Sequence, residues 1–120
     1  MAVYKPKLIL RDADLKDRKD LEALARLEIK ARLELMPSYK FDICDRKSFN
    51  ELINVIKNVD ESTKMIMACL EESRVGFMEY FLNERFNTIE SSLLYVQPEF
   101  RRKGIGSALV KSREKYAREN

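Results

Sequence analysis

The chain of 120 residues contains no histidine and only two cysteines, Cys44 and Cys69. A Ser-His or Cys-His nucleophilic pair is therefore excluded, because each needs an imidazole to take the proton. A structural zinc site normally needs four cysteine or histidine ligands, so we expect no metal. Two distant cysteines are typical of buried free thiols in a reducing compartment. Any acid-base chemistry must then use glutamate, aspartate, tyrosine, lysine or water.

Long apolar runs are missing as well. No run approaches the roughly 20 residues that span a bilayer, and residues 1–7 lack the apolar stretch of a signal peptide. The sequence thus predicts a cytoplasmic protein without a membrane partner. A net charge of +3 does not by itself indicate nucleic-acid binding. A content of 45% hydrophobic and 36% charged residues indicates one folded domain over residues 1–120.

The apolar pattern predicts the order strand, helix, helix, three strands, helix, which is an α/β (α+β) arrangement with a mostly antiparallel sheet. The expected strands are 8–10, 64–70, 74–82 and 88–96, and the expected helices are 18–35, 47–59 and the segment from 105 onward.

Local signals refine the two central helices. Asp17 is the expected N-cap of the first helix, and Asp20 places negative charge in its first turn. Leu35 is the last residue of the expected apolar face of the first helix, and Met36-Pro37 is expected to end that helix. Ser48 and Glu51 have the spacing of a capping box for the second helix.

The last predicted strand should alternate strictly between two faces. Its two expected sets of side chains are Ile89, Leu93 and Tyr95 on one face, and Glu90, Ser92, Leu94 and Val96 on the other. In the preceding strand, Gly76 indicates a bulge or a close backbone contact.

The most informative segment joins this strand to the last helix. Gly104 and Gly106 lie where the helix begins, after the basic residues Arg101, Arg102 and Lys103. Unpaired N–H groups at a helix N-terminus bind phosphate, and glycine lets a phosphate approach the backbone closely. Taken alone this pattern is weak, since it matches neither a Walker loop nor a dinucleotide fingerprint. No aromatic residues are interleaved with the basic ones, which argues against a nucleic-acid module.

The segment resembles the acetyl-CoA motif of the GNAT N-acetyltransferase superfamily, Arg/Gln-x-x-Gly-x-Gly/Ala after a strand that ends in Val-x-Pro. The matching residues are Arg101, Gly104 and Gly106, preceded by Val96 and Pro98. The order of elements also resembles the first part of that fold, and so does Arg-x-Ala at residues 11–13. The resemblance covers essentially the whole chain and implies transfer of an acetyl group from acetyl-CoA to an amine.

The resemblance also implies a division of roles in the site. Backbone groups at the strand end would pair with the pantetheine arm, and backbone N–H groups of the turn would hold the pyrophosphate. The implied cofactor-binding residues are Leu94, Tyr95, Val96, Arg101, Arg102, Lys103, Gly104, Ile105, Gly106 and Ser107. An amide near Val96 would polarise the thioester carbonyl, as an oxyanion hole does.

Some members of this family use a glutamate six residues before the position of Val96 as a general base, and Glu90 has that offset. An amine with a pKa near ~10 is mostly protonated at neutral pH, so such a base helps. We expect the Glu90 side chain on the same face as Leu94 and Val96. The alternative is a solvent-facing glutamate without a catalytic role.

The resembled fold normally continues with further strands and a helix after the position of Asn120, so we interpret the chain as a truncated domain. Residues 88–96 would then form a sheet edge, which favours a homodimer or other homo-oligomer. Three functions stay open: an active acetyltransferase, a CoA-binding module without catalysis, and a fragment kept folded by self-association. In this family the acceptor usually contacts the segment between the first two helices, here residues 37–45, to which Tyr39 and Phe41 would contribute. The alternative is that both rings pack on the core, and the segment does not identify the amine. Tyr116, at helical spacing, is expected to pack rather than act as the general acid.

Overall fold

The structure is a computed structural model that describes residues 7–35 and 46–119. The elements along the chain are β1 (Leu8–Asp12), α1 (Arg18–Leu35), α2 (Arg46–Lys57), β2 (Thr63–Leu70), β3 (Ser73–Asn83), β4 (Thr88–Val96), the 3-10 turn η1 (Pro98–Phe100) and α3 (Ile105–Glu119). This order confirms the predicted arrangement of strands and helices. Residues 37–45, with Tyr39, Phe41 and Cys44, lie outside the described residues, so the prediction for that segment stays a prediction.

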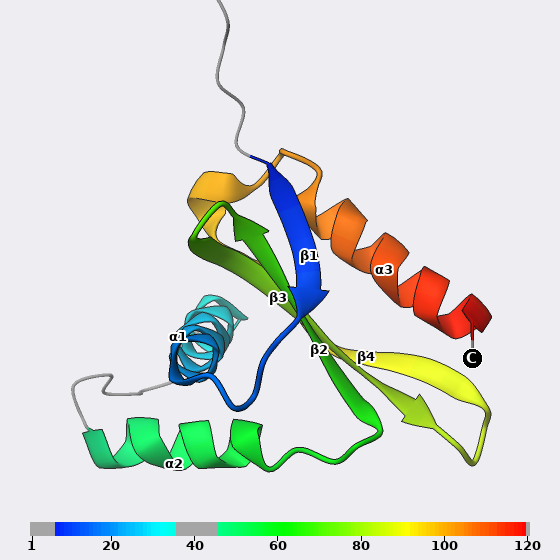
Figure 1. Ribbon diagram of the computed structural model, residues 1–120, viewed down its shortest axis with the longest axis horizontal. Helices are drawn as coiled ribbons and strands as arrows, with labels where there is room; N and C mark the ends of the chain where they lie inside the picture. Colours follow the sequence, from blue (N-terminus) through cyan, green and yellow to red (C-terminus); the bar gives the residue numbers. More distant parts are fainter. Residues whose placement is uncertain (1–6, 36–45, 120) are drawn as a thin grey trace, which may run out of the picture.

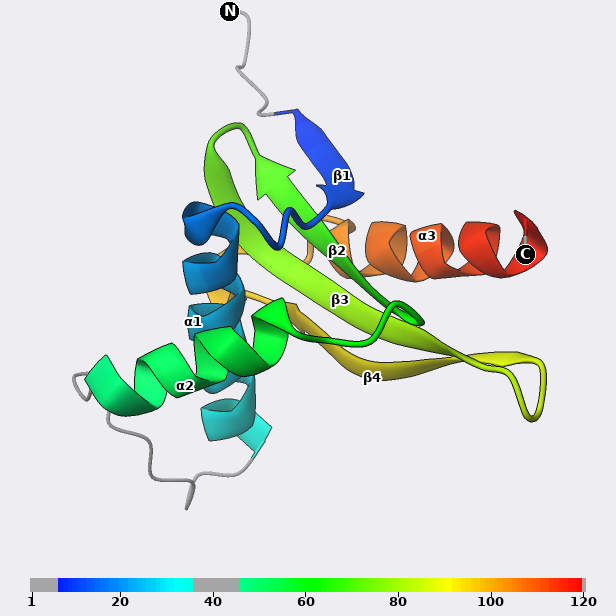
Figure 2. The ribbon, with the colours of Figure 1, turned by 60° about the horizontal axis from the view of Figure 1, so that its bottom comes forward.

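The strands form one antiparallel sheet in the order β1-β2-β3-β4. Figure 1 shows α1 and α2 on one side of this sheet and α3 on the other. Figure 2 shows α2 crossing over α1, and β4 along the margin of the sheet opposite β1. Short turns join β2 to β3 and β3 to β4, as antiparallel pairing allows, whereas α1 and α2 lie in the connection between β1 and β2.

The core consists of two clusters, one on each face of the sheet. The first packs α1 and α2 against β2, β3 and β4, and the second packs α3 against the opposite face of the same strands. Every side chain from Met65 to Cys69 is buried, with even positions in one cluster and odd positions in the other. This confirms that the apolar run of β2 is covered on both faces.

The start of α1 confirms the predicted cap. The side chain of Asp17 accepts a hydrogen bond from the N–H of Lys19 at 3.0 Å, and its carbonyl accepts one from Leu21 at 3.0 Å. These bonds satisfy two donors that the first turn of a helix otherwise leaves free.

Asp20 does more than balance the helix dipole. Its side chain is fully buried and accepts two hydrogen bonds from Arg11 of β1, at 2.6 and 2.8 Å. The Nε of Arg74 in β3 and the N–H of Asp14 also donate to it, at 2.6 and 2.8 Å. The carboxylate therefore ties α1 to two strands that are not neighbours in the sheet.

Two predictions about the helices are wrong. Helix α2 begins at Arg46, so Ser48 lies within its first turn rather than at the N-cap position that the predicted capping box requires. Leu35 is 74% exposed rather than part of the apolar face, because α1 ends there and its last turn extends past the core.

Two irregularities in strand pairing change which way side chains point. The first lies beside Gly76, where Ala68 pairs with Gly76 but Cys69 pairs with Arg74. A Cβ at Gly76 would lie only 2.7 Å from the carbonyl oxygen of Tyr95, which confirms the expected close contact.

The second irregularity is a β-bulge in β4. Leu93 pairs with Glu79, but Ser91 pairs with Tyr80, so Ser92 is an extra residue in the strand. An extra residue reverses the alternation of faces. Ile89 accordingly packs in the cluster under α3, whereas Leu93 and Tyr95 pack under α1 and α2. The prediction that these three residues share a face is wrong, because it assumed an unbroken period of two.

Candidate functional site

A cleft of about 520 Å³ opens where the end of β4, the following turn, the start of α3 and the last turn of α1 meet. Its lining residues are Ala31, Glu34, Leu35, Leu94, Tyr95, Val96, Phe100, Arg101, Arg102, Gly104, Ile105, Gly106 and Ser107. Nine of the ten residues that the motif singled out therefore meet in one place. The tenth, Lys103, lies outside the lining, with its Nζ 5.8 Å from the ring centre of Phe100.

The turn into α3 presents a row of free backbone donors. The first main-chain bond of the helix runs from the N–H of Ala108 to the carbonyl of Gly104, at 3.0 Å. Within the described part of the chain, the N–H groups of residues 102–107 make no hydrogen bond to the protein. Such a row at the positive end of a helix dipole suits an anion of the size of a phosphate group.

The backbone of this turn takes an unusual path. Arg102 and Gly104 both have positive φ angles, +65° and +81°. The space where a Cβ would stand at Gly104 and at Gly106 is empty of protein atoms to 4 Å. A ligand can therefore approach the main chain at both glycines without displacing a side chain.

Arg101 holds the start of the turn. Its Nε donates to the carbonyl of Val96 at 2.9 Å, and its two terminal nitrogens donate to the carboxylate of Glu34 at 2.7 and 2.6 Å. The guanidinium carbon also lies 5.4 Å from the ring centre of Tyr95. The hydrogen bonds to Arg101 lower the pKa of Glu34, so this pair is ionised at neutral pH.

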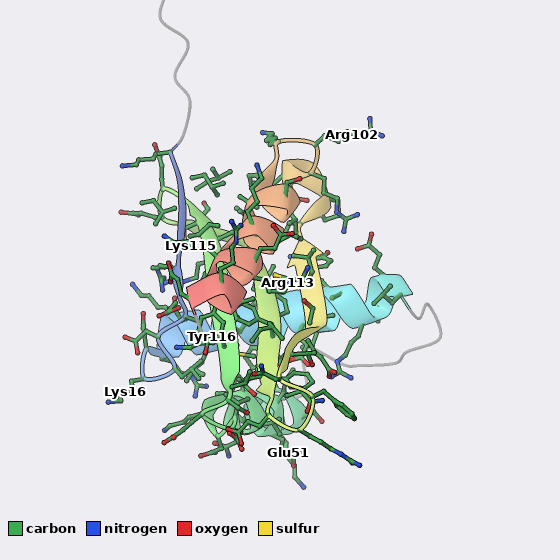
Figure 3. All side chains as sticks on the ribbon, turned by 90° about the vertical axis from the view of Figure 1, so that its right-hand side faces the viewer. Lys16, Glu51, Arg102, Arg113, Lys115 and Tyr116 are labelled. Atoms are coloured by element: carbon green, nitrogen blue, oxygen red, sulfur yellow. The ribbon has the colours of Figure 1, made fainter. Side chains whose placement is uncertain are left out.

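The next residue has a different environment. Arg102 is exposed at the tip of the turn, and its side chain projects away from the body of the molecule (Figure 3). It remains accessible to a ligand or to solvent.

Tyr95 also lines the cleft. Burial raises the pKa of its phenol, which is therefore neutral at physiological pH.

Glu90 lies apart from the cleft. It is exposed, and its Oε1 accepts a hydrogen bond from the side-chain amide of Asn83 at 3.2 Å. Because Glu90 pairs with Phe81 while Leu94 pairs with Met78, the bulge places Glu90 on the α1 and α2 face, opposite Leu94. The expectation that Glu90 shares a face with Leu94 and Val96 is therefore wrong.

Tyr116 packs as expected. Its ring lies 5.4 Å from that of Tyr80, and it belongs to the residues packed against the cluster under α3. Figure 3 shows it toward the C-terminal end of α3, with Arg113 beside β4. Arg113 donates a hydrogen bond of 2.6 Å to the hydroxyl of Ser91, which fastens the helix to β4.

Sequence reasoning missed four residues of the lining, namely Ala31, Glu34, Leu35 and Phe100. Three of them come from the end of α1, more than 55 residues before the motif, and no local pattern joins the two segments. Phe100 lies inside the motif. Its position between Pro98 and the basic residues was the one feature of the sequence that could have indicated a place in the cleft.

Among residues 7–35 and 46–119, no group of three or more cysteine, aspartate or glutamate side chains is arranged to hold a metal ion. Over the same ranges, no helix has both the length and the apolar character needed to span a membrane. Cys69 is a buried free thiol, as expected.

Comparison with known proteins agrees with the site. Residues 23–120 match the model of the acetyltransferase (GNAT) family. No curated protein matches the sequence significantly.

Several solved structures share the fold. A protein assigned to the GNAT acetyltransferases from Staphylococcus aureus superposes with a TM-score of 0.71 at 20% identity, covering 92% of this chain and 91% of its own. A PaiA N-acetyltransferase from Thermoplasma acidophilum, in complex with coenzyme A, gives 0.66 at 22% identity, covering 94% and 73%. A ribosomal-protein-alanine N-acetyltransferase from Brucella melitensis gives 0.71 at 20% identity, covering 94% and 73%. At these identities the likeness shows a common fold.

Proposed function

The chain belongs to the GNAT family of acetyltransferases, and on that premise we propose that it binds acetyl-CoA in the cleft at the end of β4 and transfers the acetyl group to an amine. The observation that carries this proposal is the row of free N–H groups at residues 102–107, which line or border that cleft. Neither the family nor the fold identifies the amine.

The residues of the cleft fit this cosubstrate. The main-chain donors of the turn would hold the diphosphate, and the empty space at Gly104 and Gly106 leaves room for it. The main chain of residues 94–96 would pair with the amide groups of the pantetheine arm, because β4 is a margin of the described sheet. When bound, the thioester supplies the activated acetyl group, and an N–H near Val96 would stabilise negative charge on its carbonyl oxygen.

Removing a proton from the amine is the step that needs a side chain. Glu90 is our candidate base, acting from the α1 and α2 face of β4. Glu90 and Leu94 pair with Phe81 and Met78, which are three positions apart on β3, so they are separated by about 10 Å along the sheet at about 3.3 Å per residue. The acceptor must therefore bind beyond the near end of the cleft, or the proton must pass through water.

Replacing Glu90 with glutamine tests this role. If Glu90 is the base, turnover should fall by about 100-fold, the usual contribution of such a group, while the Kd for acetyl-CoA stays unchanged. Steady-state release of the CoA thiol with a panel of amines, together with calorimetry, measures both quantities. Unchanged turnover would remove Glu90 from the mechanism and leave the binding proposal intact.

Binding itself is tested at Gly106. A leucine there points into the cleft, so the Kd for coenzyme A should rise by about tenfold or more, equivalent to about 1.4 kcal/mol. Stability should not fall, because leucine favours a helix over glycine by up to about 1 kcal/mol. Calorimetric titration and thermal unfolding measure the two effects.

The matched control is Ala117→Leu, which adds a leucine to an exposed position of the same helix, away from the cleft. It should leave binding of coenzyme A unchanged. If Gly106→Leu also bound coenzyme A normally, the cleft would not be the binding site.

A second candidate is a module that binds CoA without transferring its acetyl group. Two observations favour it. Glu90 lies outside the lining of the cleft, and Glu34, which is paired with Arg101, is the one carboxylate among the described residues that line it. Both candidates predict binding of coenzyme A. Amine-dependent thiol release separates them, since only the enzyme produces it.

A further inference from the structure

Three of the five N–H donors of the Arg101 guanidinium are bonded to protein acceptors, one on each nitrogen. The guanidinium donates to Val96 and to both oxygens of Glu34, and it lies over the ring of Tyr95. Arginine presents its donors in a rigid fork that matches a carboxylate, so the geometry of this pair is well defined. Both terminal nitrogens are thereby held in place at Glu34, with one N–H each directed at its carboxylate.

The turn after Arg101 needs such an anchor. Arg102 adopts a φ of +65°, which is unfavourable for a residue with a side chain, and Gly104 follows at +81°. Of the turn's three basic side chains, Arg102 and Lys103 form no ion pair with a described residue. The contacts of Arg101 thus join the turn both to the end of β4 and to the last turn of α1.

We propose that Glu34 is a positioning residue for the coenzyme turn: it holds Arg101 in place, so that the N–H groups of residues 102–107 converge on the diphosphate. Arg101 itself is then an anchor and does not contact the phosphates directly. This inference rests on the proposed function, since it concerns the affinity for the same cosubstrate. It adds a specific role for a residue of α1 that lies outside the motif.

The competing interpretation assigns Arg101 to the phosphates and makes Glu34 a competitor for its guanidinium. The two interpretations predict opposite effects of Glu34→Gln. If Glu34 competes, its neutralisation frees Arg101 and removes a negative charge near an anionic ligand, so binding becomes tighter. If Glu34 positions the turn, binding becomes weaker in spite of the more favourable charge.

The experiment measures the Kd for coenzyme A by calorimetry for the wild type, Glu34→Gln and Arg101→Lys. We expect Glu34→Gln to weaken binding about three- to fivefold, the range of a lost exposed ion pair. Arg101→Lys keeps the charge but loses the fork and the Nε, so it should weaken binding at least as much. Thermal unfolding should be nearly unchanged in Glu34→Gln, because both partners are exposed.

Glu99→Gln is the matched control. Glu99 is an exposed carboxylate two residues before Arg101, and no ion pair is formed by it among the described residues. Removing its charge should leave binding unchanged or slightly tighter. Weaker binding in Glu99→Gln equal to that in Glu34→Gln would show that the effect does not depend on the pair of Glu34 and Arg101, and it would overturn the inference.

The remaining outcomes separate the inference from its premise. If the wild type binds coenzyme A and Glu34→Gln binds it equally well or more tightly, the positioning role is wrong and the proposed function stands. If the wild type does not bind coenzyme A at all, the proposed function fails and the positioning role fails with it.

Discussion

At the scale of single residues, three arginines and two carboxylates define the difference between structural and functional charge in this protein. Asp20 is fully buried and accepts donors from Arg11 and Arg74, whereas Glu34 is 44% exposed where it meets Arg101 beside the cleft. A buried carboxylate depends on its partners, because water cannot replace them. An exposed pair contributes little to folding and is free to serve a ligand site.

Asp20 is therefore the residue whose charge we expect to matter most for stability. Asp20→Asn keeps the shape but removes the counter-charge of Arg11 and leaves Arg74 only its 3.7 Å ion pair with Asp17, so it should lower the unfolding free energy by about 3 kcal/mol. The hydrogen bonds from Arg11 lower the pKa of Asp20 well below its ordinary value of 3.8. The ionised form thus stabilises the fold above that value, and its contribution declines as the pH falls below it.

Denaturant unfolding of wild type and Asp20→Asn from pH 7 to pH 2 measures both effects. The difference between the two proteins should be largest at neutral pH and should shrink in acid. Asp14→Asn is a suitable control, because its exposed side chain forms no ion pair with a described residue. A difference that stayed constant down to pH 2 would contradict the pKa argument.

Contacts of single residues could be predicted from the sequence only when the two partners are close together in the chain. The cap at Asp17 could be predicted because its partner is two residues away. Neither the contact of Asp20 with Arg74, 54 residues apart, nor that of Glu34 with Arg101, 67 apart, leaves a local pattern. The glycines of the motif could be assigned because their conformation follows from their own lack of a side chain.

At the scale of elements, periodicity predicted almost every helix and strand, since each buries one face or two against a continuous core. Periodicity failed within β4, where Ser92 forms a bulge and no glycine or proline in the strand indicates it. That one residue moved Ile89 and Glu90 to the faces opposite those expected. Strand propensity does not depend on which face a side chain points to. The predicted bounds of β4 were therefore right although the predicted faces of its first residues were wrong.

The separation of β3 and β4 near the cleft depends on Gly76. In Gly76→Ala the new methyl group would lie 2.7 Å from the carbonyl oxygen of Tyr95. Backbone must then move, so we expect a loss of about 1–3 kcal/mol in stability, as for other overpacked sites, and weaker binding of coenzyme A.

Urea unfolding and calorimetry of Gly76→Ala measure these two losses. Gly104→Ala is an informative comparison, because a Cβ there meets no protein atom but must adopt a φ of +81°. Normal stability in Gly76→Ala would show that the end of β4 can shift without cost.

At the scale of the whole molecule, the described sheet has two outer strands that are treated differently. β1 is five residues long and is tied to α1 through Arg11, whereas β4 has nine residues and borders the cleft. Leu94 of β4 is 42% exposed. A long unpaired strand edge is a common site of association.

We therefore expect the protein to self-associate through β4. Sedimentation velocity over a concentration series should show a dimer or larger species at high micromolar concentration. Leu94→Lys, which places a charge on this edge, should shift the equilibrium toward monomer. A sharp monomer peak for the wild type at all concentrations would contradict the expectation.

The buried carboxylate of α1 has one more consequence, for the order in which the molecule can come apart. Arg11 and Arg74 belong to strands separated by β2, and both donate to the same side chain. Detaching β1 would remove Arg11 from the buried carboxylate of Asp20 and leave Arg74 as its remaining main partner. Local unfolding of β1 therefore has a high free-energy cost. Local opening of the sheet should begin at its other margin, beside the cleft, where a bound ligand would oppose it.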